Sequence, residues 1–159
     1  MDDVPIGFPS APGCSKTVGE GEPPLEARAM AVTVEGVRLW SLYVPNGRSL
    51  DDPHLAYKLD WLARLASDTK TWLAEHLTTP LALMGDWNIA PLDTDVWPTW
   101  DFEGSTHTSP AERAAFAEFE TIGLAGVVRP RIPEGSTSWD YQQPRCPRNE
   151  GSATALRLG

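Results

Sequence analysis

Cysteine, long apolar runs and net positive charge are all scarce in this chain of 159 residues. The two cysteines, Cys14 and Cys146, form no spaced disulfide framework and no zinc site, so we expect unpaired thiols in a reducing compartment. No apolar stretch approaches the roughly 20 residues that span a bilayer, and no membrane partner is expected. The acidic opening Met1-Asp2-Asp3 is unlike the basic start of a secretory signal, so we expect a cytoplasmic location.

Acidic residues outnumber basic ones, with 22 Asp and Glu against 13 Lys and Arg, and the net charge is −9. Proteins that bind nucleic acid usually contact phosphate through Lys and Arg, so a DNA partner would need a local basic patch. The candidates for such a patch are Lys58, Arg48, Arg145 and Arg148. With 41% hydrophobic residues the chain can bury a core, and we expect residues 1–159 to form a single domain.

The residue patterns predict an α/β domain with a mixed sheet. Strands are expected over residues 29–34, 37–44, 81–84 and 124–128, and helices from Pro53 to about Leu77 and from Pro110 to Gly123. Glu35-Gly36 is a short turn that suits an antiparallel hairpin. Asp52 precedes a proline in the manner of an N-cap, and Ser109 opens a capping box. The proline-rich first part should carry little regular structure.

Residues 85–97 follow an apolar strand with three carboxylates and an amide, in the order Gly-Asp-Trp-Asn-Ile-Ala-Pro-Leu-Asp-Thr-Asp-Val-Trp. Asp86 and Asn88 are two residues apart and project to the same side while the chain is extended. Carboxylate and amide oxygens suit a hard cation such as Mg²⁺, which in turn offsets the charge of a phosphodiester. An isolated Asp-x-Asn pair is more often only a turn cap, and this alternative stays open here.

Together with residues 43–47 (Tyr-Val-Pro-Asn-Gly) and 57–62 (Tyr-Lys-Leu-Asp-Trp-Leu), this motif resembles the exonuclease III branch of the endonuclease/exonuclease/phosphatase superfamily. The three blocks occur in the order found in that family, and the extension Pro-x-Asp-x-Asp-Val-Trp distinguishes this branch from relatives that act on lipids or inositol phosphates. The resemblance implies a partial two-sheet α/β sandwich whose mixed sheets are covered by helices. It runs to about Gly151 and covers the middle of the family's domain.

The resemblance also implies a function in DNA repair. It indicates a metal-assisted phosphodiester hydrolase, acting as a 3′-5′ exonuclease and abasic-site endonuclease, with Mg²⁺, or Mn²⁺ in its place, as cofactor. The expected partner is duplex DNA with abasic sites or 3′ ends, bound by a monomer. The implied catalytic residues are Asp86, Asn88 and Tyr43, the implied metal ligands are Asp86 and Asn88, and the implied substrate-binding residues are Lys58, Asn46 and Trp139.

Each of these residues also has an ordinary structural explanation. Tyr43 fits a core aromatic in an alternating strand, Asn46 a turn, and Lys58 a solvated charge on a helix. Asp93 and Asp95 are expected to organise the loop. Surface or structural roles are expected for the three histidines, which are His54, His76 and His107, because none has the Asp-His pairing that activates a water.

Both ends of the chain depart from the family pattern. The Asn and the metal-binding Glu that open the family's domain are not found, Ala155 stands where an aspartate is usual, and the closing Ser-Asp-His block is missing. Residues 152–159 therefore resemble an aberrant tail. Two hypotheses follow, a nuclease of exonuclease III type or an inactive fragment that at most binds nucleic acid weakly. From these departures we expect the isolated chain to be poorly soluble or partly unfolded, and nearly inactive.

Overall fold

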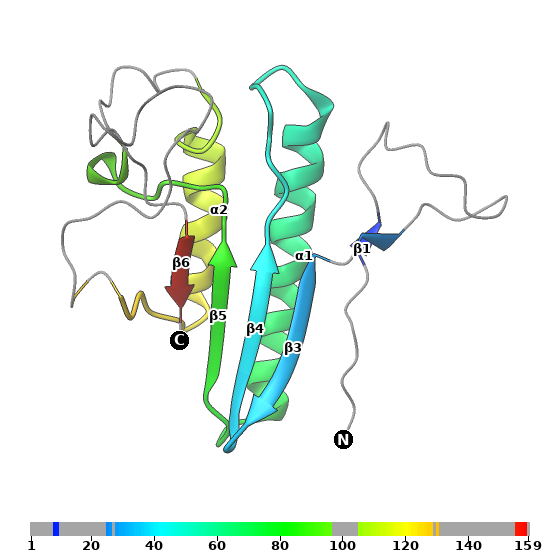
Figure 1. Ribbon diagram of the computed structural model, residues 1–159, viewed down its shortest axis with the longest axis vertical. Coiled ribbons are helices and arrows are strands. Elements are labelled where there is room, and N and C mark those ends of the chain that lie inside the picture. Colours follow the sequence, from blue (N-terminus) through cyan, green and yellow to red (C-terminus); the bar gives the residue numbers. More distant parts are fainter. Residues whose placement is uncertain are drawn as a thin grey trace, which may run out of the picture.

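A four-stranded mixed sheet with two helices on one face forms the centre of the molecule (Figure 1). The computed structural model describes residues 8–9, 25–26, 28–96, 105–128, 130 and 155–158. The sheet consists of β3 (Ala29–Val34), β4 (Val37–Tyr43), β5 (Leu81–Asp86) and β6 (Ala155–Leu158), in that order. β4 and β5 run parallel, whereas the two outer strands pair antiparallel to them. A separate pair joins β1 (Phe8–Pro9) to β2 (Leu25–Glu26).

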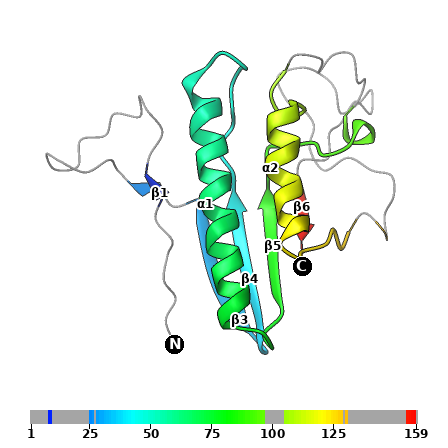
Figure 2. The same ribbon diagram turned by 180° about the vertical axis from the view of Figure 1, so that it is seen from behind.

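Both helices lie on the same side of the sheet, as Figure 2 shows from behind. α1 (Pro53–Glu75) makes the crossover between the parallel strands β4 and β5, and α2 (Pro110–Thr121) follows the loop that contains the short 3₁₀ turn η1 (Asp93–Asp95). Each helix begins with a side-chain cap. The carboxylate of Asp52 accepts a hydrogen bond from the His54 backbone N–H at 2.8 Å, and Ser109 forms a capping box with Glu112.

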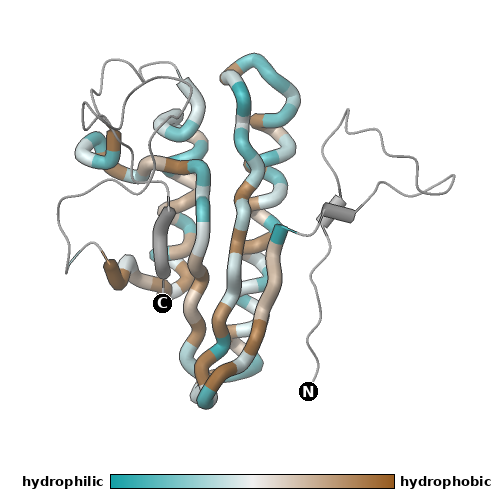
Figure 3. Tube along the Cα trace, in the orientation of Figure 1, coloured by the Kyte–Doolittle hydropathy of each residue, from teal (hydrophilic) through white to brown (hydrophobic). Residues whose placement is uncertain are grey.

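The hydrophobic core lies between this face of the sheet and the helices. Trp40 and Leu42 alternate along β4 toward the helices, and Trp61 packs from α1. Trp87 is fully buried, with edge-to-face contacts to the rings of Phe116 and Phe119 on α2. Figure 3 shows the corresponding pattern, with hydrophobic residues along the central strands and mixed polarity along the helices.

The opposite face of the sheet is not covered by any helix of the described residues. Its exposed apolar side chains include Met30, Val32 and Val34, with Met30 69% exposed. Among the described residues, the second sheet consists of the two-stranded pair of β1 and β2. Within the same residues, no helix combines the length and apolarity that crossing a bilayer requires.

Most elements predicted from local patterns are confirmed, including the hairpin, the strand before Asp86 and both helices. The strand predicted over residues 124–128 is wrong, because no strand forms there. Gly123 has a positive φ, which ends α2. The next residue, Leu124, is buried, and its backbone N–H donates to the Phe119 carbonyl at 3.0 Å. These apolar residues therefore close the end of α2 instead of extending the sheet.

Candidate active site

The candidate site lies where the parallel strands β4 and β5 end side by side. Tyr43 and Asp86 are register partners at the last position of each strand, so their side chains belong to the same face of the sheet. Gly85, the residue before Asp86, has φ of +136° and lies directly against Leu42 of β4. This close approach of two backbones requires glycine and brings the ends of the strands together.

Asn88 lies two residues after Asp86, and four of its own polar groups have hydrogen-bonding partners. Its backbone N–H donates to Asp86 Oδ1 at 3.0 Å, and its backbone carbonyl accepts from Lys58 Nζ. Its side-chain nitrogen donates to the Val44 carbonyl at 2.9 Å, and its side-chain oxygen lies 3.2 Å from His107 Nε2. The residue is 7% exposed and has φ of +48°, an uncommon value outside glycine. Asn88 is therefore a fixed group and not a mobile surface amide.

Lys58 does not extend into solvent as a phosphate-binding residue would. Its side chain is fully buried, and its ammonium lies 2.5 Å from Glu112 Oε1 and also contacts the Asn88 carbonyl. The structure shows this buried contact with Glu112 of α2, and the expected contact of Lys58 with phosphate stays a prediction. Glu112 is also fully buried, and its other oxygen accepts from Ser109 Oγ at 2.6 Å.

The charges of this buried pair respond to their surroundings in different ways. Burial lowers the pKa of Lys58, and the hydrogen bond and negative charge of Glu112 oppose that effect. Burial alone would raise the pKa of Glu112, but its hydrogen bond with Lys58, the charge of Lys58 and the hydrogen bond with Ser109 together hold that pKa below its usual value. We therefore describe the pair as an ammonium and a carboxylate that stabilise one another.

His107 reaches the site from the loop before α2, although only a surface or structural role was expected for it from the sequence. Burial lowers its pKa, and the nearby charge of Lys58 lowers it further, so the ring is neutral at pH 7. Thr106 Oγ1 lies 3.0 Å from Nδ1, and the Asn88 side-chain oxygen lies 3.2 Å from Nε2. The Asn88 oxygen is an acceptor and Thr106 can donate, so these two partners favour a ring proton on Nε2, whereas the Asn46 side-chain nitrogen, 3.5 Å from the same Nε2, favours a proton on Nδ1.

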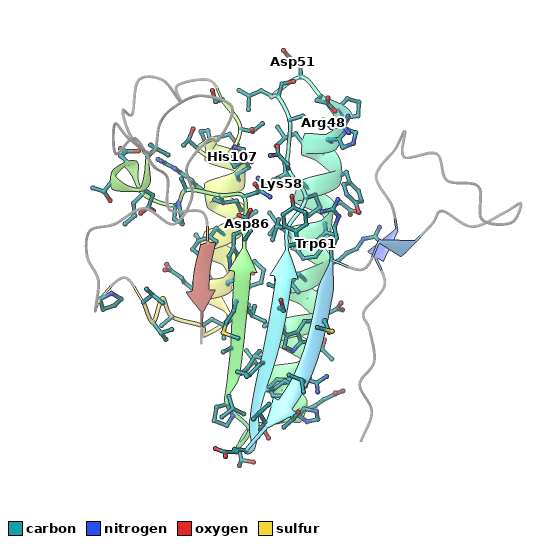
Figure 4. The ribbon with its side chains drawn as sticks, in the orientation of Figure 1. Arg48, Asp51, Lys58, Trp61, Asp86 and His107 are labelled. Carbon is teal, nitrogen blue, oxygen red and sulfur yellow. The ribbon has the colours of Figure 1, made fainter. Side chains whose placement is uncertain are left out.

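Asn46 and Tyr43 complete the rim of the site. Asn46 accepts from the Arg48 backbone N–H at 2.8 Å, as a turn residue does, and its side-chain nitrogen lies 3.5 Å from His107 Nε2. Tyr43 is 56% exposed, and the Arg28 guanidinium lies 5.3 Å from the centre of its ring. Figure 4 shows Asp86, Lys58 and His107 close together near the ends of the central strands, with Arg48 farther along.

The loop after Asn88 is tied to α2. Arg113 donates to the Ala90 carbonyl at 3.1 Å and to Asp93 Oδ1 at 2.8 Å, while Asp95 accepts from the Leu92 backbone N–H at 2.9 Å. The role expected for Asp93 and Asp95 in organising this loop is confirmed. In addition, the Ala90 backbone N–H donates to the His107 carbonyl at 2.8 Å, which connects this loop with the one that precedes α2.

Trp139, expected to bind substrate, lies outside the described part of the chain, as do Arg145 and Arg148, the candidates for a basic patch, and both cysteines. Within the described part, no group of three or more His, Cys, Asp or Glu side chains could hold a metal ion by itself. Asp86 is half-buried, and its Oδ1 accepts a hydrogen bond from the Asn88 backbone N–H, the hydrogen bond of this carboxylate found within the described part. Asp86 Oδ2 is therefore the oxygen best placed to meet a cation.

Comparison with known proteins places this geometry in a nuclease fold. No protein-family model matches the chain. The exodeoxyribonuclease of Bacillus subtilis (strain 168) is 28% identical over 137 residues, which make up 84% of this chain and 53% of that protein. The 3′-5′ exonuclease NExo from Neisseria meningitidis matches with a TM-score of 0.79 and 31% identity, over 98% of this chain and 59% of that one.

Two further solved structures agree. NExo, described as a 3′ phosphatase bound to a product DNA hairpin, has a TM-score of 0.78 and 31% identity over 98% of this chain and 58% of that one. An AP endonuclease from Archaeoglobus fulgidus has a TM-score of 0.75 and 25% identity over 87% and 55%. The chain therefore has the fold of exonuclease III and AP endonuclease type nucleases, as the sequence resemblance indicated, and spans somewhat more than half the length of these relatives.

Proposed function

We propose that this chain contributes part of the active site of a metal-dependent phosphodiesterase that acts on DNA, of the 3′-5′ exonuclease and abasic-site endonuclease type. The observation that carries the proposal is the fixed pair of Asp86 and Asn88 at the joined ends of β4 and β5. The similarity to DNA-acting nucleases, including one solved with a DNA hairpin, supports the choice of substrate. The net charge of −9 means that DNA would have to be held through a few local contacts.

Asp86 fits the role of a ligand to Mg²⁺. Magnesium is typically bound through one or two carboxylates, with waters and substrate phosphates as its other ligands, so a single carboxylate with one oxygen available matches that mode. A divalent ion held there would offset the charge of the phosphodiester. The Asn88 oxygen already meets His107 at 3.2 Å, so we assign Asn88 to orientation of the phosphate and not to the metal.

In this proposal, Asn88 and Tyr43 contact the phosphate of the substrate. One N–H of the Asn88 side chain is donated to Val44, and we propose that the second points to a phosphate oxygen. Tyr43, exposed beside Asp86, would present its hydroxyl to the same group. Asn46 stays at the rim, where its contact with His107 supports the loop. Trp139 remains a candidate for contact with the sugar at an abasic site.

The test is hydrolysis of two duplexes, one with a single abasic site and one with recessed 3′ ends, in the presence of Mg²⁺ or Mn²⁺. Cleavage, low as we expect it to be for this chain, should require the metal and fall by at least about 100-fold in Asp86→Asn, because the carboxylate is lost while its shape is kept. Asp60→Asn is a matched control, since Asp60 pairs with Arg64 on the exposed side of α1, where both side chains are at least half exposed. Mn²⁺ binding followed by electron paramagnetic resonance gives a readout that does not require turnover.

Two outcomes would contradict the proposal. One is cleavage that is equally fast in the Asp86→Asn and Asp60→Asn variants. The other is the absence of both cleavage and Asp86-dependent Mn²⁺ binding in a folded sample, which would favour the alternative of a non-catalytic module that binds nucleic acid weakly.

A further inference from the structure

A buried ion pair between α1 and α2 lies beside the candidate site and contacts two of its segments. Lys58 on α1 and Glu112 on α2 are both fully buried, and Lys58 Nζ lies 2.5 Å from Glu112 Oε1. Each partner also holds a different segment of the site. Lys58 donates to the Asn88 backbone carbonyl, whereas Glu112 Oε2 accepts from Ser109 Oγ at 2.6 Å and from the Ser109 backbone N–H at 3.3 Å, two residues after His107. The pair thus connects the turn after β5 to the loop before α2.

Both of these segments contain a residue in a conformation that side chains disfavour. Asn88 has φ of +48° and His107 has φ of +77°. Asparagine and histidine adopt this region more readily than most residues, and surrounding contacts that hold them there offset its remaining cost. The contact of Lys58 with the Asn88 backbone is one such contact, and Glu112 holds Ser109, two residues after His107, through its side-chain and backbone donors. The two side chains then meet across the site, since His107 Nε2 lies 3.2 Å from the Asn88 oxygen.

Stability alone is a weak explanation for this pair. Two charges lose their hydration when they are buried, and replacing a buried ion pair with neutral side chains of similar volume is often harmless to stability. We infer that Lys58 and Glu112 are positioning residues, which hold the Asn88 amide and the His107 ring in place beside Asp86. This inference rests on the proposed function, because it concerns the geometry of that same site.

The decisive variant is Lys58→Met with Glu112→Gln. Methionine keeps the length of Lys58 without its charge or its hydrogen bond to Asn88, and glutamine can keep the capping box with Ser109. We expect a thermal midpoint close to that of the unchanged protein, a KM within about twofold, and a kcat at least about 10-fold lower, because small displacements of reacting groups are costly. A kcat within about twofold of the unchanged protein would overturn the inference.

Lys58→Met alone is the comparison variant, because it leaves the carboxylate of Glu112 buried without its counter-ion. We expect this variant to lose both stability and activity, whereas the double variant should lose activity alone. If the double variant also unfolds, Glu112→Gln by itself provides the second test. It keeps Lys58 beside Asn88 and should retain more activity than Lys58→Met, and the reverse order would contradict the inference.

A second readout requires no turnover. In ¹⁵N-labelled protein, the side-chain amide of Asn88 and the ring nitrogens of His107 should shift or broaden in the double variant, while the Leu83 amide in the core stays unchanged. Unchanged Asn88 and His107 signals would overturn the inference. If the unchanged protein shows neither Asp86-dependent hydrolysis nor Asp86-dependent Mn²⁺ binding, the proposed function fails on its own, and these signals still decide the role of the pair.

Discussion

Gly85→Ala is expected to be among the most damaging single changes outside the core. A Cβ atom at this position would lie 2.0 Å from the Leu42 carbonyl oxygen and 2.9 Å from the Leu42 nitrogen and carbonyl carbon. All three are backbone atoms of the neighbouring strand, so no rotation of a side chain can relieve the overlap. The φ of +136° is also a conformation that alanine rarely adopts.

The cost can be estimated from these two effects. A residue forced into a sparsely populated backbone region costs about 1–3 kcal/mol. Relief of the overlap must move β4 away from β5, and each ladder hydrogen bond lost between them costs about 1 kcal/mol. We therefore expect a total loss of about 3–5 kcal/mol, a large fraction of the roughly 5–15 kcal/mol that stabilises a typical domain. The same movement would separate Tyr43 from Asp86.

Gly36→Ala is the matched control. Gly36 has φ of +80° in the hairpin turn, but a Cβ atom there would meet nothing within 4 Å, so only the conformational cost of about 1 kcal/mol applies. Urea unfolding followed by circular dichroism measures both variants against the unchanged protein. If the losses for Gly85→Ala and Gly36→Ala agree within about 1 kcal/mol, the close approach of the two strands is not what requires glycine, and the reasoning is refuted.

Three further changes have defined outcomes. Asp52→Ala should lower the thermal midpoint because α1 loses its N-cap, whereas Asp52→Asn, which keeps a capping oxygen and loses only the charge, should lower it less. The backbone hydrogen bond from His54 lowers the pKa of Asp52. The stability contributed by the Asp52 charge is therefore complete above the ordinary pKa of 3.8 and is lost as the pH falls through the lowered pKa. Thermal midpoints measured from pH 5 to 2 should fall less steeply in Asp52→Asn. Trp87→Ala should cost about 3–5 kcal/mol in urea unfolding, because it empties the space between Phe116 and Phe119, and a loss below about 1 kcal/mol would contradict that packing.

The elements with local signals were predictable from the sequence. The turn at Glu35-Gly36, the cap at Asp52 and the capping box at Ser109 each depend on residues within a few positions of one another, and all three occur as expected. The strand expected over 124–128 failed because a short apolar run after a helix fits either a strand or the closure of that helix. Only the tertiary contact of Leu124 with the core distinguishes the two.

The spacing of Lys58 and Glu112 along their helices indicates that both are buried, although charged residues are usually exposed. Lys58 precedes Trp61 and Leu62 by three and four positions, so it lies on the apolar stripe of α1, and Glu112 stands in the same relation to Phe116 on α2. A charged residue on such a stripe must find a counter-ion or move to the edge of the helix. Which partner it finds could not be read from the sequence, because the two residues are 54 positions apart and meet only when the helices pack.

Glu112 shows how one side chain can belong both to local structure and to the site. Its Oε2 atom closes the capping box with Ser109, and its Oε1 atom receives Lys58, which in turn holds the Asn88 carbonyl. The capping box is a sufficient explanation for a glutamate at this position, so no pattern in the sequence placed Glu112 near Asp86. Because a single carboxylate serves both purposes, the first turn of α2 and the orientation of Asn88 are set together. The same contacts that begin the helix therefore also fix the groups that would meet a phosphate.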